Sequence, residues 1–342
     1  MKFDVVIGNP PYQENDKSAS ASAKPLYNKF FELSKKMSNE TVSLIFPARW
    51  LSGAGKGLQK FTEEMINDKH IKSITVYKNS RKVFPDNDIK GGVMYLTYNK
   101  YFEGKTNITV VDKDNTISDY KGYLNSEGCG MFIPYKELLT IFRKVIKSSF
   151  ISMDSLASSR KPYGLPTNFF TNNDELSQQR ERNDDIEIIG LIKGKRVKRY
   201  INKDFPFKSG KESIFKWKVF SGKAMGSGEY GEKLPDLPIG APGVVSTETF
   251  IKIGDFGTEF EAAAVKKYFY TKFFRSLLGI IKTTQDAPSR VYKFIPIQDF
   301  TEKSDINWKK SINEIDEQLF KKYSLSTEEI NFIKNKVADM SD

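Results

Sequence analysis

A short stretch near the N-terminus combines the residue types that can hold a planar amino group. An apolar run at residues 3–7 is followed, after a glycine, by Asn9, Pro10, Pro11 and Tyr12. Because β-branched residues dominate the run and turn residues end it, the pattern predicts a buried strand and then a loop. Two successive prolines remove two backbone donors and stiffen the loop, so its carbonyls are free to accept hydrogen bonds. The loop should present an amide, carbonyl acceptors and an aromatic ring at the C-terminal end of a strand, where open α/β sheets bind ligands.

This stretch resembles the Asn-Pro-Pro-Tyr motif of N6-adenine DNA methyltransferases, together with the strand that precedes the motif in that family. The resemblance implies that the Asn9 side chain and the Pro10 carbonyl accept hydrogen bonds from the adenine amino group. Tyr12 would stack on the base after it is flipped out of the duplex, with Pro11 in the same pocket. Acceptors aimed at both amino hydrogens raise the electron density on nitrogen as it attacks the methyl sulfonium. The structural alternative is a plain turn after a strand.

Two further segments extend the resemblance. Residues 44–50 are similar to the strand and turn that follow the motif in gamma-ordered adenine methyltransferases of restriction–modification systems. Residues 83–93 resemble the segment in which that family places a second aromatic residue against the flipped base. Phe84 is therefore the candidate for the opposite wall of the pocket, with a core phenylalanine as the alternative. Arg49 is predicted to contact DNA or the target pocket, whereas Trp50 is expected to pack beneath the turn.

The composition indicates a globular protein with an anionic partner. The chain has 342 residues, of which 39% are hydrophobic and 13% aromatic, so one large domain or two ordinary domains can form a core. Its formal net charge is +11, and the sequence pI is near 9.3. An excess of this size favours a polyanion such as double-stranded DNA. The alternative is a lysine-rich composition without a functional meaning.

The reactive side chains narrow the classes of site. The single cysteine, Cys129, excludes a disulfide framework and fits a reducing cytoplasm. The single histidine, His70, excludes a histidine-based zinc site and makes a Ser-His-Asp triad improbable, and no metal site is expected. No apolar stretch approaches the roughly 20 residues of a membrane span, and no signal-peptide pattern is present. We therefore expect a soluble, cytoplasmic protein with no membrane partner.

Strands and helices alternate after the motif. Strands are predicted at residues 3–7, 41–46, 71–77, 92–98 and 108–112, the last as an edge strand, and helices at 26–37 and 58–67, with a polar loop at 13–24 and a glycine-rich turn at 53–57. This order predicts an α/β domain over residues 1–125, with a mostly parallel, Rossmann-like sheet covered by helices on both faces. The glycine-rich turn lacks the spacing of a P-loop or of a dinucleotide fingerprint.

The segment that binds the cofactor in the family is expected to be missing. The gamma order places the strand and the glycine-rich turn for S-adenosylmethionine upstream of the Asn-Pro-Pro-Tyr loop, and here the motif begins at residue 9. Residues 222–228 are rich in glycine but lack a flanking strand and helix. The chain therefore resembles the C-terminal portion of a type II, IIG-like enzyme, comprising the catalytic loop and the target-recognition region. Its methyltransferase sheet should be incomplete and should have an open edge.

The rest of the chain, residues 126–342, is predicted to form a mixed α+β target-recognition domain. A helix should begin near Pro134 and end near residue 147, and a long amphipathic helix should cover residues 259–281. Two helices are predicted at 308–322 and 327–338, with Ser326 and Glu329 as the capping box of the second.

Basic and polar side chains in this region are candidates for DNA contact. They are Lys195, Arg196, Lys198 and Arg199 beside a predicted strand, Lys216 and Lys218 in a strand of alternating lysines, and Gln285 and Arg290 after the long helix. The lysines and arginines of the strands suit phosphate contact, whereas glutamine and arginine can also read adenine and guanine edges. Residues 215–224 and 282–296 are also similar to the recognition regions of these methylases. The alternative for the basic run is a solvated face.

Two functions from different classes fit the sequence. The first is adenine-N6 methylation of DNA, in which S-adenosylmethionine is bound mainly by a partner chain that carries the cofactor-binding half. The second is a DNA-binding specificity module, or a remnant, that does not turn over. A nuclease is not supported, because Asp86, Asp112 and Lys113 have the wrong spacing for a Pro-Asp…Asp-x-Lys site.

Overall fold

A computed structural model describes residues 2–14, 24–53, 57–147 and 150–340 of the chain. The chain forms two compact units, residues 1–140 and 141–342, whereas the sequence places the boundary at residue 125. Each unit is described by itself. Most of the predicted loop at 13–24 and of the glycine-rich turn at 53–57 lies outside the described residues.

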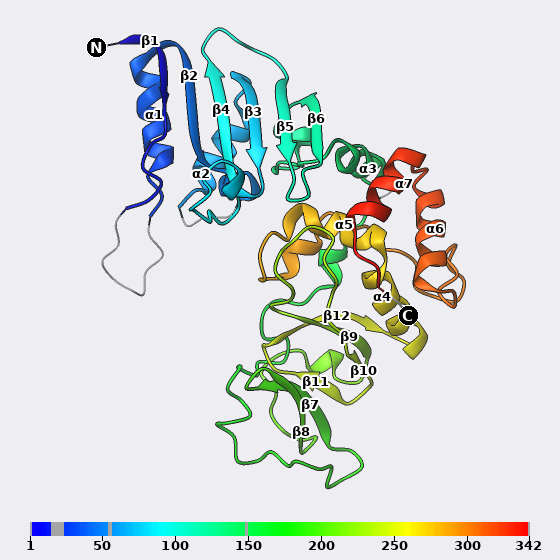
Figure 1. Ribbon diagram of the computed structural model, residues 1–342. Coiled ribbons are helices and arrows are strands. Elements are labelled where there is room, and N and C mark those ends of the chain that lie inside the picture. The colour runs from blue at the N-terminus through cyan, green and yellow to red at the C-terminus, as the bar shows by residue number, and fades with distance from the viewer. Residues whose placement is uncertain (1, 15–23, 54–56, 148–149, 341–342) are drawn as a thin grey trace. The chain divides into compact units, whose positions relative to one another are not determined.

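The first unit is built on a six-stranded sheet with the strand order β1-β2-β4-β3-β5-β6 (Figure 1). Its elements are β1 (Phe3–Gly8), α1 (Tyr27–Met37), β2 (Ser38–Pro47), α2 (Gln59–Asn67), β3 (Ile71–Tyr77), β4 (Val93–Asn99), β5 (Thr106–Val111) and β6 (Ile117–Gly122). β1 pairs with β2 and β3 pairs with β5 in parallel, and the other three pairings are antiparallel. The fold is α/β with a mixed sheet, so the prediction of a mostly parallel sheet is wrong.

Two strands account for this difference. β4 inserts between β2 and β3 and runs against both, which the order of elements along the chain does not reveal. β6 forms a hairpin with β5 through the turn at residues 112–116, so β6 is the edge strand and the predicted edge strand lies inside the sheet. The C-terminal ends of β1, β2, β3 and β5 consequently share one edge of the sheet with the start of β4. This edge is called the upper edge below.

One face of the sheet carries the core of the first unit. Strand residues such as Val42, Leu44 and Leu96 are buried there against α1 and α2, which contribute Phe31 and Phe61. Apolar residues on alternate positions of a strand bury one face of a sheet in this way. Both helices lie on this face.

The opposite face is open among the described residues, so the prediction that helices cover both faces is wrong. Residues that pair on neighbouring strands have side chains on the same face of the sheet. One row of such paired residues crosses the sheet from β1 to β5 and consists of Ile7, Ser43, Thr97, Ser73 and Asn107. None of these side chains is fully buried, and Ile7 is 76% exposed. The further residues on this face are Phe3, Val5, Ile45, Tyr95, Thr75, Tyr77 and Thr109. An uncharged and partly exposed surface thus spans β1 to β5, and we call it the open face.

The second unit is mixed α+β, as the sequence predicts for this region. It contains two three-stranded sheets with the orders β11-β7-β8 and β10-β9-β12. Its strands are β7 (Ile186–Ile192), β8 (Lys195–Ile201), β9 (Trp217–Gly222), β10 (Ile239–Gly240), β11 (Val244–Ser246) and β12 (Phe250–Phe256). Its helices are α4 (Glu259–Tyr270), α5 (Lys272–Ile281), α6 (Ile312–Lys322) and α7 (Thr327–Lys336), and α3 (Lys136–Lys147) spans the boundary between the units.

The single long helix predicted at residues 259–281 is two helices. Thr271 has an extended backbone, with φ −60° and ψ 147°, and its hydroxyl accepts a hydrogen bond from the Phe274 N–H as the N-cap of α5. The Asp316 carboxylate of α6 accepts from the backbone N–H groups of Lys272 and Phe273 at 2.8 and 2.9 Å. Because these acceptors satisfy the first donors of α5, the chain can break between two helical segments.

The C-terminal helices agree with the prediction in order and in capping. The Ser326 side chain accepts from the Glu329 N–H, and the Glu329 carboxylate accepts from the Ser326 N–H, which is the predicted capping box. None of the helices in the described part of the chain is long and apolar enough to cross a membrane.

Candidate functional site

The predicted catalytic loop leaves β1 at the upper edge of the sheet. Gly8, the last residue of β1, pairs with Leu44 of β2, and Asn9 and Pro11 are exposed directly after it. The backbone N–H of Leu26 donates to the Tyr12 carbonyl at 3.0 Å, one residue before α1 begins. The loop is therefore fixed at one end by the sheet and at the other by the start of a helix. The exposed Asn9 amide makes no hydrogen bond to another described residue.

Tyr12 is half-buried and packs against the core of the first unit. Its hydroxyl is buried without a hydrogen-bond partner among the described residues. Burial, with a smaller contribution from the nearby Tyr95, raises the pKa of Tyr12 to about 12. The phenol is therefore neutral at physiological pH, and it leaves a donor and an acceptor unused next to the loop.

A second turn at the upper edge lies close to the segment that carries Phe84. The Ala48 N–H, just after β2, donates to the Gly92 carbonyl at 3.1 Å. A Cβ on Gly91 would lie 2.9 Å from the Cβ of Arg49, so the two turns are in contact and only glycine fits at this point. Arg49 is exposed, and Trp50 is fully buried as predicted.

Phe84 follows β3 in the loop that leads to β4 and is half-buried. Its N–H donates to the Ser80 carbonyl, and the Ser80 hydroxyl donates to the Asn87 carbonyl at 3.0 Å, which ties the loop together. The structure thus brings the motif loop, the Arg49 turn and the Phe84 loop to the same edge of one sheet.

Sequence reasoning missed a polar group at this edge. The Tyr135 hydroxyl donates to the Asp112 carboxylate at 2.6 Å and accepts a hydrogen bond from the Lys78 ammonium. Lys78 and Asp112 follow β3 and β5, so their side chains meet at the ends of two parallel neighbours. The pairing of β3 with β5, which the sequence does not show, is what brings them together. Among the described residues, no group of three or more histidine, cysteine, aspartate or glutamate side chains could hold a metal ion.

The basic run of β8 is partly engaged within the second unit. Arg196 donates to the Asp236 carboxylate at 2.8 Å, and Lys198 forms an ion pair with Glu187 at 2.8 Å. The Arg199 guanidinium lies over the ring of Phe170 at 5.9 Å. Lys195 is exposed at the start of the strand.

Lys218 contradicts the prediction that it contacts DNA. Its side chain is fully buried, and its ammonium donates to the carbonyls of Ser213, Ile214 and Val244 at 2.7, 2.8 and 3.1 Å. The prediction is wrong because Lys218, the lysine within β9, points into the unit, where these carbonyls accept from its ammonium. Lys216, two residues earlier and just before the strand, is exposed.

The polar segment after α5 is held against a glycine-rich loop. The Met225 N–H donates to the Gln285 carbonyl at 2.9 Å, and the Ala287 N–H donates to the Lys223 carbonyl at 2.8 Å. The side chains of Gln285 and Arg290 are exposed on this segment. They remain candidates for DNA contact.

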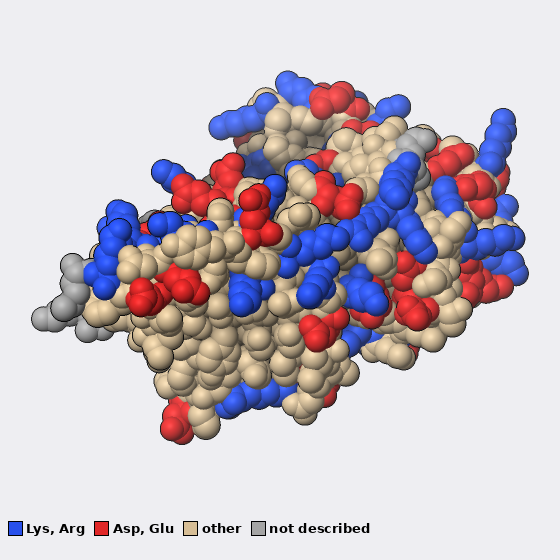
Figure 2. Space-filling model, turned by 90° about the horizontal axis from the view of Figure 1, so that it is seen from above, with Lys and Arg blue, Asp and Glu red and all other residues tan. Residues whose placement is uncertain are grey.

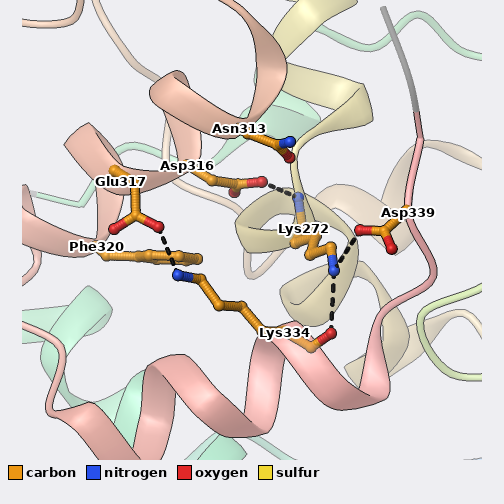
Figure 3. Close-up of a pocket in the computed structure, with 7 residues that line it drawn as sticks. All are labelled: Lys272, Asn313, Asp316, Glu317, Phe320, Lys334 and Asp339. Carbon is orange, nitrogen blue, oxygen red and sulfur yellow. Dashed lines mark hydrogen bonds and ion pairs between the residues drawn. The ribbon is translucent and has the colours of Figure 1, made fainter.

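The second unit also has a cavity of about 310 Å³ between α5, α6 and α7 (Figure 3). The charged groups that line it pair with one another. Lys272 bonds to Asp339 at 2.6 Å and to the Lys334 carbonyl at 3.0 Å, and Lys334 pairs with Glu317 at 2.7 Å. These pairs join the three helices, and we assign no ligand to the cavity.

β1, which leads into the motif loop, lies at an edge of the sheet among the described residues. No described strand lies beyond β1, and Val5 and Ile7 are 55% and 76% exposed there. The glycine-rich segment at residues 222–228 belongs to the second unit and contacts residues 283–285.

In the view of Figure 2, basic and acidic side chains are interspersed and a broad uncharged area lies among them.

Comparisons with known proteins agree with the resemblance of the N-terminal part. Residues 1–84 match the Eco57I restriction-modification methylase family. Over 167 residues the chain is 29% identical to an uncharacterized adenine-specific methylase from Mycoplasma pneumoniae, an alignment that covers 46% of this chain and 38% of that protein. These similarities support a restriction–modification methylase.

Two solved structures align with 97% of the chain at low sequence identity. The type IIL restriction-modification enzyme MmeI, solved in complex with DNA, matches with a TM-score of 0.50 and 10% identity over 97% of this chain and 56% of its own. The type IIG restriction endonuclease BpuSI matches with a TM-score of 0.40 and 12% identity over 97% of this chain and 53% of its own. At this identity the likeness to MmeI concerns the fold alone. The chain spans little more than half of either enzyme and less than half of the curated relative.

Proposed function

We propose that this chain supplies the catalytic loop and the DNA-binding region for N6-methylation of adenine in DNA, within a restriction–modification system. The observation that carries the proposal is the Asn9–Tyr12 loop at the upper edge of the sheet, in which Asn9 and Pro11 are exposed, inside the segment that matches the methylase family. DNA is the partner, and S-adenosylmethionine is the methyl donor that a methylase of this family implies.

The loop can hold an amino group without further residues. The Asn9 side-chain oxygen and the Pro10 carbonyl are acceptors for the two amino hydrogens of a flipped adenine, and Tyr12 offers an aromatic face. Phe84 and Arg49, on the neighbouring loops, form the opposite side of the pocket. No residue of the chain has to act as a base of special pKa, because the amino nitrogen loses its proton after it has attacked.

We propose further that polypeptide outside residues 1–342, such as a second chain, supplies the cofactor site by docking on β1 and on the open face. An unpaired strand edge offers backbone donors and acceptors to another strand. The exposed apolar side chains beside it, Phe3, Val5 and Ile7, offer area that would be buried by such a partner. Both features lie next to the motif loop, where a methyl donor has to approach the target nitrogen.

The test measures transfer of radiolabelled methyl groups from S-adenosylmethionine to mixed-sequence duplex DNA by the purified chain, with Asn9→Ala alongside. We expect no incorporation by the chain alone, together with salt-sensitive DNA binding by both proteins. Incorporation that disappears in the Asn9→Ala variant would show that the chain holds a complete cofactor site. It would thereby refute the need for additional polypeptide.

A cellular assay tests the docking surface. N6-methyladenine in the DNA of cells that encode the protein is quantified after replacement of the gene by Asn9→Ala, Val5→Lys or Tyr101→Lys. Tyr101 is 75% exposed and lies outside the open face, so its variant is the matched control. We expect loss of methylation in the first two strains and no loss in the third. Unchanged methylation in the Val5→Lys strain would argue against docking at β1.

The alternative function is a DNA-binding module without turnover. The half-buried Tyr12 ring, which packs on the core of the first unit, favours it, because stacking on a base needs an accessible face. Under this alternative, Asn9→Ala leaves cellular methylation unchanged while DNA binding persists.

A further inference from the structure

A buried carboxylate in the second unit holds two exposed basic side chains. The Glu248 side chain is only 8% exposed, and Glu248 lies two residues after the end of β11. It accepts hydrogen bonds from Thr167 at 2.7 Å and from an Arg160 terminal nitrogen at 3.2 Å, and it pairs with Lys161 at 3.3 Å. The Arg160 and Lys161 side chains are 64% and 47% exposed. One negative charge thus lies beneath two positive charges that face solvent.

The loop that carries these cations, residues 157–167, is fixed along its length. The Ser158 N–H donates to the Lys252 carbonyl at 2.8 Å, and the Glu248 N–H donates to the Leu165 carbonyl at 2.9 Å. Tyr163, within the loop, is fully buried. Lys161 has a φ of 61°, a left-handed conformation that is unfavourable for a residue with a side chain. Such a conformation persists only where the surroundings enforce it.

The arrangement differs from that of Asp236, another carboxylate of the second unit that two cations share. Asp236 also pairs with two cations, Arg196 and Lys266, but there the acid is 61% exposed and the cations are 38% and 29% exposed. At Glu248 the carboxylate is buried and the two cationic side chains are exposed to solvent. A buried carboxylate is satisfied by one cation and a hydroxyl, so balance of its charge does not require both Arg160 and Lys161.

We propose that Arg160 and Lys161 form a contact site for the backbone phosphates of DNA, with Glu248 and Thr167 fixing the two side chains in place. The inference rests on the proposed function in one respect, namely that the second unit binds DNA. Fixing long side chains before binding lowers the conformational entropy that a contact loses. The pair retains a net positive charge toward solvent.

Phosphate suits the site better than a base edge does. Reading guanine requires an arginine that presents two free parallel donors, and one terminal nitrogen of Arg160 is engaged by Glu248. Lys161 is a point charge without a planar set of donors. Two adjacent point-like contacts therefore favour recognition of the backbone without regard to sequence.

The experiment measures binding of mixed-sequence duplex DNA by fluorescence anisotropy between about 50 and 200 mM salt, the range over which phosphate contacts dominate the salt dependence. The key variant combines Arg160→Gln, Lys161→Gln and Glu248→Gln, so that no buried carboxylate loses its partners. Each lost phosphate contact should reduce the slope of log K against log salt by about 0.9, and we expect a reduction of about 1 to 2. Thermal unfolding of each variant confirms that it is folded.

Two controls separate this effect from net charge and from the carboxylate. Lys303→Gln changes the net charge by the same amount at an exposed lysine that forms no ion pair with another described residue. Glu248→Gln alone keeps both cations and should keep the slope of the unchanged protein. A triple-variant slope equal to that of Lys303→Gln would overturn the inference, and so would a loss of affinity that depends on sequence at constant slope. If the unchanged chain binds no DNA at all, both the proposed function and the phosphate site are refuted.

Discussion

Lys218 makes the sharpest prediction about the second unit, because burial of its ammonium links stability to pH. Burial lowers the pKa of this lysine from its usual value of 10.5 to about 7. In the folded protein Lys218 therefore loses its proton near neutral pH, whereas in the unfolded chain it keeps the proton until pH 10.5. Between these values the unfolded state binds more protons, so the free energy of unfolding rises with pH through this group.

The size of the effect follows from the two pKa values. One pKa unit corresponds to about 1.36 kcal/mol, and a shift from 10.5 to about 7 gives a contribution of about 3 to 4 kcal/mol between pH 7 and 10. Lys218→Met removes the titrating group and fills similar volume. The difference in unfolding free energy between the unchanged protein and this variant should therefore shift by that amount, in favour of the unchanged protein as pH rises.

Urea unfolding followed by tryptophan fluorescence at several pH values between 6 and 10 measures this difference. Lys216→Met, at the exposed lysine two residues earlier, is the control and should follow the unchanged protein at every pH. Parallel pH curves for the unchanged protein and Lys218→Met would refute the reasoning. Because the Lys218 ammonium donates inward to three carbonyls, Lys218→Met should also leave the salt dependence of DNA binding unchanged.

Three further predictions concern the fold. Burial raises the pKa of Asp316 to about 6, so the stability that this group contributes is lost as pH rises from about 4 through 6. The unfolding free energy of Asp316→Asn, measured with urea, should therefore rise by about 2 kcal/mol relative to that of the unchanged protein between pH 4 and 7. Thr271→Ala should lower the unfolding free energy by about 1 kcal/mol by removing the N-cap of α5, whereas Thr271→Ser should restore it. Gly92→Ala should lower the melting temperature more than Gly128→Ala does. Both glycines have a positive φ, but only a Cβ on Gly92 would meet a carbonyl oxygen, that of Tyr77 at 2.3 Å. Equal losses of melting temperature would contradict this.

Local patterns predicted most elements of the first unit, but they missed β6, and β1, predicted as a buried strand, is mostly exposed. The strand predicted at residues 71–77 is β3, and the helices predicted at 26–37 and 58–67 are α1 and α2 to within one residue. Period-two and period-3.6 patterns report which side chains a strand or helix buries, and this information is contained in the segment itself. The position of Asn9 after β1 follows from the same local information.

Pairing between distant segments could not be predicted in the same way. The insertion of β4 between β2 and β3 makes the sheet mixed, and no local signal specifies it. The break at Thr271 depends on Asp316, which lies 45 residues later and supplies acceptors for the start of α5. The inward orientation of Lys218 depends on carbonyls of other segments, including that of Val244, and the meeting of Lys78 with Asp112 depends on the pairing of β3 with β5.

The two candidate functions differ in the first unit alone. The second unit has a core of its own, built on residues such as Ile188, Phe220 and Val245, and it carries the exposed candidates for DNA contact. The proposed DNA binding by this unit should therefore not depend on whether the open face of the first unit is covered. The proposed methyl transfer should depend on that face, because Asn9 lies at the end of the strand whose outer edge is unpaired among the described residues. Binding and catalysis are thus separable by variants at β1, and a variant such as Val5→Lys should abolish only methylation if a partner completes the sheet.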